Sequence, residues 1–339
     1  MADRKLLFEW PELGLKARAS LADDKNPELC EEVWNALPFE SIMNNAVVTD
    51  GSMYCWVPML SFAPIHHKER IDLAPVGRLR YSQNTGNKVI IQYDTCNEDI
   101  MGAVLGQIDE EDLKTVRKVG LEAKNAIFMT KKEIHVRISR LEERGGNEKE
   151  DEAAEEKQRA CQVLTKPEKC RPEAEALVEE LMELAEDASR REPPEHKDIR
   201  TGKNSGMGSC QQYFSTWEFV YSLSRDLSMY TLYPIARLCR SKNFSVRQLE
   251  EIYMEIDPTY TNLLGSYGLK KLRRLARRFR ELIAEKTLTK EEFRYILDAF
   301  VFYTDMIAQW TYFYYPWGIG CACFRFDEEH TTYVPGQGD

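Results

Sequence analysis

The pattern of apolar and polar positions divides the chain into a strand-rich first part and a helical second part. Apolar side chains alternate with polar ones from residue 5 to 21 around a central Pro11-Glu12-Leu13-Gly14, which predicts a β-hairpin. Strand patterns return in residues 40–57, 76–81 and 89–93, and an apolar run covers 100–108. Asn84-Thr85-Gly86-Asn87 has the composition of a hairpin turn. One short helix interrupts the strands: Asn26 is its predicted N-cap, Pro27 its first residue, and Pro38 ends it.

Helical spacing dominates from Asp109 onward. We expect a helix from 109 to about 144, a helix with a narrow apolar seam within the Glu- and Lys-rich residues 148–192, and a protease-sensitive loop over 193–208. Further helices are predicted in residues 210–239, with a kink near Pro234, from Ser245 to Ile256, from 269 to 286 and from 289 to 315. The predicted fold is therefore α+β and multidomain, with a strand-rich domain at 1–108, an all-α helical bundle at 109–326 and a tail at 327–339.

Composition narrows the classes of function. The 339 residues carry a net charge of -10, which argues against general affinity for nucleic acid. No apolar run is long enough for a membrane span, and no apolar core follows the N-terminal residues, so a cytoplasmic protein is expected. The nine scattered cysteines suggest free thiols in a reducing compartment. Cys321-Ala322-Cys323 lacks the further ligands of a metal site, so no metal is expected.

Known cofactor fingerprints are missing from the sequence. Gly206-Met207-Gly208 and Gly318-Ile319-Gly320 lack the third glycine of a dinucleotide-binding turn, and neither a phosphate-binding loop nor a Gly-x-Ser-x-Gly elbow occurs. We therefore expect no nicotinamide or nucleotide cofactor.

Ionisable, aromatic and turn residues are concentrated between Tyr54 and Tyr93. Two of the five histidines, His66 and His67, adjoin Lys68, Glu69 and Arg70. Pro64 and Pro75 flank this cluster and disfavour a helix. Ionisable residues on a loop between strands are a common arrangement of a functional site, and a solvated charged loop is the alternative.

Two helical segments have alternative interpretations. The basic residues of 269–286 suggest either a phosphate-binding surface or, as we favour, a face paired with the acidic segment. The aromatic run from Trp310 to Trp317 suggests a core, or an interface through which the helical domain forms a homo-oligomer.

Residues in the first part resemble a known group of barrels. The segment Asn26–Phe39, the strand Gly77–Tyr81 and the strand Val89–Asp94 resemble the cyclophilin-like fold. Together with the opening Leu7–Gly14 and the large helical domain, they resemble the cucumopine and mikimopine synthases, which are opine synthases carried on transferred DNA (T-DNA). The resemblance implies a cyclophilin-like β-barrel followed by a helical bundle.

The resemblance also implies a reaction. These enzymes condense L-histidine with 2-oxoglutarate without NADH: the amine forms an imine with the ketone, the imidazole carbon closes a six-membered ring in a Pictet-Spengler step, and a base removes the ring proton. No cofactor is needed, in agreement with the missing glycine fingerprints. The alternative is a non-catalytic cyclophilin-like binding module whose helical domain mediates association.

The implied chemistry assigns expected roles to the Tyr54–Tyr93 stretch. The substrate carboxylates require cations, and four are available: Lys68, Arg70, Arg78 and Arg80. Glu69 is the expected base, with His66 or His67 as alternatives. The aromatic candidates for stacking on the imidazole or donating hydroxyl hydrogen bonds are Tyr54, Trp56, Tyr81 and Tyr93. Strand alternation puts Arg78 and Arg80 on one face and Leu79 and Tyr81 on the other, so they cannot all line one pocket.

Overall fold

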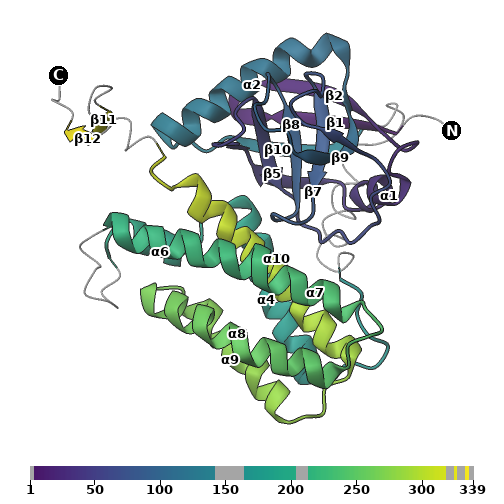
Figure 1. Ribbon diagram of the computed structural model, residues 1–339, viewed down its shortest axis with the longest axis vertical. Coiled ribbons are helices and arrows are strands. Elements are labelled where there is room, and N and C mark those ends of the chain that lie inside the picture. The colour runs from purple at the N-terminus through teal and green to yellow at the C-terminus, as the bar shows by residue number, and fades with distance from the viewer. Residues whose placement is uncertain (1–3, 142–163, 204–212, 318–323, 327–332, 336–339) are drawn as a thin grey trace.

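The structure is a computed structural model that describes residues 4–141, 164–203, 213–317, 324–326 and 333–335. Figure 1 shows a barrel of strands packed on a layer of helices, with the last long helix crossing that layer and reaching the barrel at its C-terminal end. The predicted class, a β-barrel followed by a helical bundle, is confirmed.

A ten-stranded antiparallel sheet curls into a nearly closed barrel. Its strand order is β3-β10-β1-β2-β9-β7-β8-β5-β4, and β6 pairs with β9. The strands are β1 (Lys5–Trp10), β2 (Leu15–Leu21), β3 (Phe39–Ile42), β4 (Asn44–Asn45), β5 (Ser52–Trp56), β6 (Lys68–Arg70), β7 (Arg78–Ser82), β8 (Lys88–Gln92), β9 (Met101–Ile108) and β10 (His135–Arg140). The predicted hairpin of residues 5–21 is confirmed as β1 and β2.

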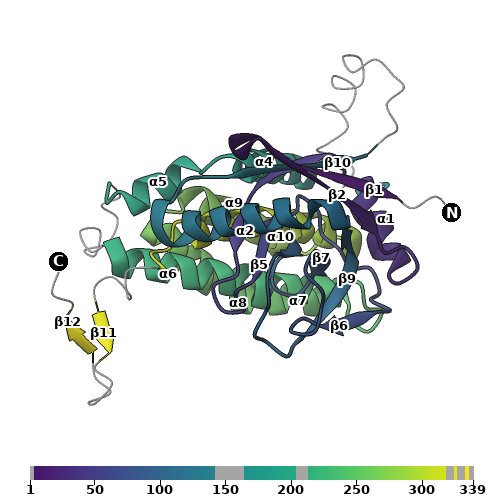
Figure 2. The same cartoon turned by 90° about the horizontal axis from the view of Figure 1, so that it is seen from above.

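Helix α2 (Leu113–Asn125) fills the concave side of the sheet. Val116, Val119 and Ala123 are fully buried in the barrel core, as their helical spacing requires. Figure 2 shows α2 lying across the strands. Gly120 lets the helix approach the ring of Tyr93, because a Cβ atom at this position would overlap that ring.

The predicted helix over 109–144 is wrong in its second half. A five-residue π-helical turn, Ala126–Thr130, follows α2, and Lys131 then adopts a positive φ of 54° that stops the helix. Residues His135–Arg140 form β10, which pairs with both β1 and β3. Val136 and Ile138 are buried in the barrel, so tertiary pairing overrides the local helical pattern, and the sheet extends past the boundary expected at residue 108.

The second part is a bundle of seven helices within the described residues. They are α4 (Pro172–Arg190), α5 (Pro194–Arg200), α6 (Tyr213–Arg225), α7 (Tyr233–Cys239), α8 (Val246–Tyr267), α9 (Lys270–Ala284) and α10 (Lys290–Phe313). Helix α1 (Pro27–Asn35) belongs to the barrel. Strands β11 (Phe324–Phe326) and β12 (Tyr333–Pro335) form a separate antiparallel pair.

Two predicted breaks in the bundle are wrong. Helix α8 continues through Pro258 to Tyr267, and buried contacts of Asp257 and Thr261 with Arg280 of α9 hold the chain helical around the proline. The expected loop over 193–208 is wrong for α5, which begins with Pro194 at its first position; residues 201–203 are not helical, and residues 204–208 lie outside the described residues. The predicted cap at Ser245 is confirmed as a capping box, and Thr289, where we expect the last helix to begin, also forms one.

Helix α10 joins the two parts of the molecule. Gln309 accepts a 3.0 Å hydrogen bond from Ser41 of β3, and the Tyr312 hydroxyl donates to the Asn45 carbonyl at 2.9 Å. Trp310 and Phe313 are buried in the barrel core, whereas the other aromatic residues of the run from Trp310 to Trp317 are partly buried. No described helix has both the length and the apolar character for crossing a membrane.

Candidate active site

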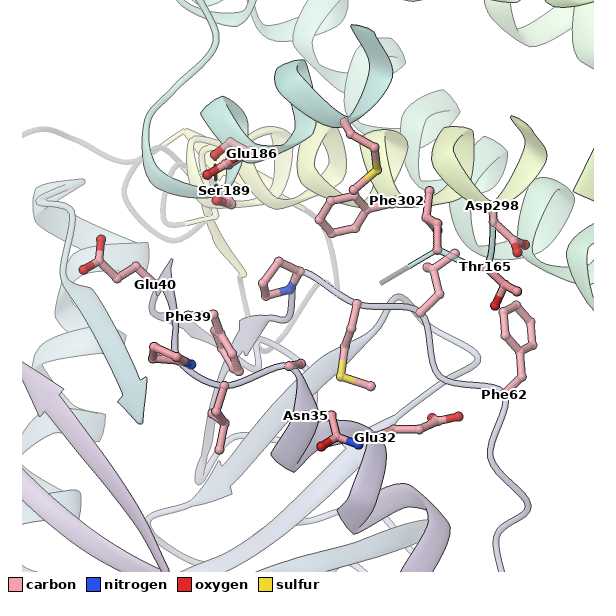
Figure 3. A pocket seen from close by; sticks show the side chains of 18 of the residues that line it. Glu32, Asn35, Phe39, Glu40, Phe62, Thr165, Glu186, Ser189, Asp298 and Phe302 are labelled. Atoms are coloured by element: carbon pink, nitrogen blue, oxygen red, sulfur yellow. Dashed lines mark hydrogen bonds between the residues drawn. The ribbon is translucent and has the colours of Figure 1, made fainter. Parts of the chain in front are cut away.

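A cleft of about 870 Å³ lies between the barrel and the bundle. The barrel contributes α1, the segment leading into β3 and the loop after β5, and the bundle contributes α4, α7 and α10 (Figure 3). Its apolar walls include Phe39, Met59, Leu60, Phe62, Met182 and Phe302, and its charged residues are Glu32, Glu40, Arg140, Glu186, Arg190, Arg240, Arg294 and Asp298. A large cleft with apolar walls and converging charges is the usual form of a small-molecule site.

The loop after β5 is fixed by buried hydrogen bonds. The Ser61 amide donates to Asn87 Oδ1 at 2.9 Å, and the Ser61 carbonyl accepts from the Tyr233 hydroxyl at 2.8 Å. Gln83 donates to Ser61 Oγ at 3.0 Å and to the Ala63 carbonyl at 2.9 Å. The wall of the cleft is therefore positioned by β7, β8 and the bundle together.

Glu32 is a carboxyl group of the cleft with a perturbed acidity. It lies on α1 and is half-buried, with its Oε2 atom enclosed and without a hydrogen-bond partner among the described residues. Burial raises its pKa above the usual range, against hydrogen bonds from Ser61 and the Ala63 amide and the charge of Arg240. A carboxyl whose pKa is shifted toward neutrality is suited to proton transfer.

Cations face Glu32 from the bundle side. Arg240 forms a two-pronged ion pair with Asp298, at 3.0 and 2.8 Å, and its guanidinium stacks 3.4 Å from the ring centre of Phe62. Burial raises the pKa of Asp298, and Arg240 opposes that increase. Arg294, one turn of α10 earlier, has neither an ion pair nor a hydrogen bond to any other described residue, so its guanidinium is available to an anion.

A buried polar centre continues along the same face of α10. Asp305 accepts from the amide and side-chain nitrogens of Asn87, at 3.4 and 3.2 Å, and from the Ser228 hydroxyl. Burial raises the pKa of Asp305. Tyr81 donates to Asn87 Oδ1 at 3.0 Å, and its raised pKa, mainly an effect of burial, also reflects the negative charges of Glu32 and Asp305. The hydroxyl of Tyr81 thus lies near both the cleft carboxyl and this centre.

The cluster expected from the sequence at residues 66–70 lies on the surface beside β9, and it does not line the cleft. Lys68–Arg70 form β6 instead of a loop. Glu69 pairs with Arg78 at 2.5 Å, and their side chains are 20% and 14% exposed. His66 pairs with Glu28 at 2.9 Å and Arg70 with Asp72 at 2.6 Å, whereas Lys68 and His67 are exposed. Glu69 stays a predicted base. Its partner Arg78 is one of the cations that we expect to bind a substrate carboxylate.

The other expected residues divide between the two faces of the sheet, as strand alternation predicts. Tyr81 and Tyr93 are in the barrel core, and the Tyr93 hydroxyl donates to Asn45 at 2.9 Å. Tyr54 and Trp56 pack against the bundle. Arg80 is only 2% exposed; it donates to Ser52 Oγ at 2.8 Å, while its Nε and Nη1 have no partner among the described residues.

No pattern in the sequence indicates that the charged residues of the cleft belong to a site. Glu32 and Arg240 lie on amphipathic helices, where a charged residue normally marks a solvated face, and Arg294 and Asp298 lie on an apolar helix. They come together only because the barrel and the bundle face each other across the cleft. The described residues contain no group of three or more His, Cys, Asp or Glu side chains suited to a metal ion, and Cys321-Ala322-Cys323 falls outside them.

Comparisons with known proteins agree with this architecture. Residues 174–313 match the family model of the cucumopine synthase C-terminal helical bundle domain. The structure of McbB in complex with tryptophan is similar over 94% of this chain and 99% of that chain, with a TM-score of 0.81 and 26% sequence identity. A solution structure of the hypothetical protein AF2241 from Archaeoglobus fulgidus overlaps 41% of this chain at 12% identity, with a TM-score of only 0.28. No curated protein matches the sequence.

Proposed function

We propose that this chain, whose helical bundle belongs to the cucumopine synthase C-terminal domain family, is an opine synthase that condenses an amino acid with a 2-oxo acid. The expected substrates are L-histidine and 2-oxoglutarate, and the product is cucumopine or mikimopine. The observation that carries the proposal is the cleft, in which a carboxyl with a raised pKa faces arginines across the boundary between barrel and bundle.

The charges of the cleft suit substrates that bring three carboxylates. Arg294 has neither an ion pair nor a hydrogen bond among the described residues, so a substrate carboxylate can approach its guanidinium, whereas Arg240 is already paired with Asp298. Arg190 is paired with Glu186 at 3.0 Å, and Arg140 donates to the Trp34 carbonyl at 2.9 Å. McbB binds tryptophan, so a related fold accommodates an aromatic amino acid.

The proposed reaction requires one proton acceptor and no hydride. The amine and the ketone form an imine with loss of water, the imidazole carbon attacks the imine carbon, and a base takes the ring proton. Glu32 is the base that we propose from the structure, because its enclosed Oε2 lacks a partner and its pKa is raised by burial. Glu69, predicted from the sequence, is the competing candidate.

The test is incubation of the full chain with L-histidine and 2-oxoglutarate, with and without NADH, followed by mass spectrometry. We expect a cyclised condensation product at the same rate in both samples. A strict requirement for NADH would contradict a condensation without reduction. Absence of any condensation product with histidine, tryptophan or other amino acids would favour the non-catalytic binding module.

A further inference from the structure

Lys88 takes no part in the reaction steps proposed above. It begins β8 and pairs in register with Trp56 of β5, and Tyr54 lies two residues earlier on the same face of that strand. This face is turned toward the bundle, where Tyr312 of α10 packs 5.7 Å from Tyr54 and 6.1 Å from Trp56, between ring centres. Lys88 therefore lies between the barrel and the bundle.

The amine of Lys88 has no conventional partner. Its Nζ lies 4.7 Å from the ring centre of Tyr54 and 5.0 Å from that of Trp56, and it has neither an ion pair nor a hydrogen-bond acceptor among the described residues. The residue as a whole is half-buried. The buried indole nitrogen of Trp56, beside it, also lacks an acceptor among the described residues. Two neighbouring donors without acceptors are the arrangement expected where a ligand oxygen binds.

A second buried lysine shows what a structural role looks like in this fold. Lys131 donates to the carbonyls of Phe313 and Tyr315, at 2.8 and 2.6 Å, and to that of Ile127. These bonds tie the end of the π-helical turn to the end of α10. Lys88 is half-buried like Lys131, but it makes no hydrogen bond to a described carbonyl group.

The charges around Lys88 favour its neutral form. Burial lowers its pKa to about 7; Arg225 of α6 lowers it further, and Asp305 of α10 opposes the decrease. The other titratable groups of this layer, Tyr54, Tyr312 and Tyr221, have pKa values raised by burial and are neutral at pH 7. Lys88 therefore loses its proton much more readily near neutral pH than an exposed lysine does.

We propose that Lys88 is a nucleophilic residue that forms an imine with the 2-oxo acid substrate. This proposal rests on the proposed function. The neutral amine attacks the ketone carbon and the carbinolamine loses the ketone oxygen as water, which leaves a C=N bond. The amine of the amino acid then attacks that carbon and releases Lys88, so no oxidant or reductant takes part. Asp305, whose charge acts on Lys88, follows Phe302 of the cleft wall by one turn on the same face of α10.

Reductive trapping tests the imine directly. The full chain is incubated at pH 7 with 2-oxoglutarate or pyruvate and sodium cyanoborohydride, and the modified peptide is identified by mass spectrometry. We expect one reduced adduct, on Lys88, in the parent and in Lys131→Met, and none in Lys88→Met. Adducts spread over exposed lysines, or no adduct with either acid, would overturn the proposal. Trapping needs no turnover, so its result is independent of the condensation assay.

Lys88→Arg separates chemistry from packing. Arginine keeps the cation over the rings of Tyr54 and Trp56 but cannot form an imine under these conditions. If Lys88 acts as the nucleophile, condensation falls on the order of 10²-fold or more in Lys88→Arg while the melting temperature stays close to that of the parent. If condensation in Lys88→Arg stays within a few-fold of the parent, Lys88 only packs the two parts together and the proposal is wrong.

Discussion

The acidity of single carboxyl groups depends on what encloses them. Glu31 and Glu32 are neighbours on α1, yet Glu31 is exposed and pairs with Arg4 at 2.6 Å, while Glu32 faces the cleft with its Oε2 unpaired among the described residues. The one-residue step rotates the second side chain by about 100° toward the bundle. A glutamate is therefore a solvated surface residue at position 31 and, in our proposal, the group that transfers a proton at position 32.

Glu32→Gln is expected to reduce condensation by about 10²-fold or more with little change in folding, because glutamine cannot accept the ring proton. In the parent, the activity should increase with pH through the raised pKa of Glu32, since only the ionised form is a base. Steady-state rates across pH 4 to 8 measure both effects.

Two substitutions control this experiment. Glu31→Gln removes only an exposed ion pair, worth about 0 to 1 kcal/mol, and should leave the rate within a few-fold of the parent. Glu69→Gln tests the base predicted from the sequence. A large loss in Glu69→Gln together with a near-normal rate in Glu32→Gln would assign the proton transfer to Glu69 and its Arg78 partner.

At the scale of elements, close helix packing relies on one small residue in α2. Gly120→Ala should destabilise the fold by about 1 to 3 kcal/mol, because the new methyl group would overlap the ring of Tyr93, which is 2% exposed. Alanine normally stabilises a helix relative to glycine, so a loss of stability opposes the intrinsic propensity. Urea denaturation measures it, and Leu121→Ala on the exposed side of α2 should change stability by less than about 0.5 kcal/mol. An unchanged or increased stability in Gly120→Ala would contradict this packing.

A buried ion pair holds α8 against α9. Asp257 is 2% exposed and Arg280 14%, so Arg280→Met should cost about 3 to 5 kcal/mol by leaving the carboxylate without its counter-charge. Burial already raises the pKa of Asp257, and Arg280 opposes that increase. Without Arg280 the folded state binds the proton more tightly than the unfolded state does, so lowering the pH from 7 toward 5 should recover part of the lost stability.

The same helix α9 provides the matched control. Arg277 and Glu281 lie 3.5 Å apart with side chains 68% and 65% exposed, and Arg277→Met should change the free energy of unfolding by no more than about 1 kcal/mol. Equal losses in Arg277→Met and Arg280→Met would show that burial of the Asp257 pair is not what stabilises the contact.

At the scale of the whole molecule, barrel and bundle are joined by buried polar contacts as well as by apolar packing. Ser41 with Gln309, Asn87 with Asp305 and Ser61 with Tyr233 are hydrogen-bonded across the boundary, and each of these six residues is buried. If the barrel and the bundle separated without unfolding, these polar groups would lose their hydrogen-bond partners, and apolar surface at the boundary would be exposed to water.

We therefore expect the two parts to unfold in one cooperative step. Far-ultraviolet circular dichroism reports mainly the helices, and tryptophan fluorescence reports both parts, because Trp10 lies in the barrel core, Trp217 in the bundle core, and Trp56 and Trp310 at the boundary. The two signals should give coincident transitions in urea. A first transition confined to the helical signal, with the barrel retained, would show that the boundary is not part of one cooperative unit.

The sequence by itself determined the class of fold and most of its elements, because these depend on local periodicity and local chemistry. The alternation in residues 5–21, the capping residues Ser245 and Thr289 and the basic stripe of α9 are each explained within one element. The missing glycine fingerprints and the resemblance of the first strands likewise needed no tertiary information. The family match of residues 174–313 agrees with that interpretation.

Only the tertiary structure decided where the charges of a site meet. Glu32, Arg240 and Arg294 are separated by long stretches of sequence and line one cleft because barrel and bundle face each other there. The conspicuous cluster His66–Arg70 lies instead on an edge of the sheet, where its charges pair locally. β10 likewise forms because β1 and β3 offer unpaired edges, which no local pattern records. Burial, and with it the shift of a pKa toward neutrality, is a property of the packed molecule and not of the residue.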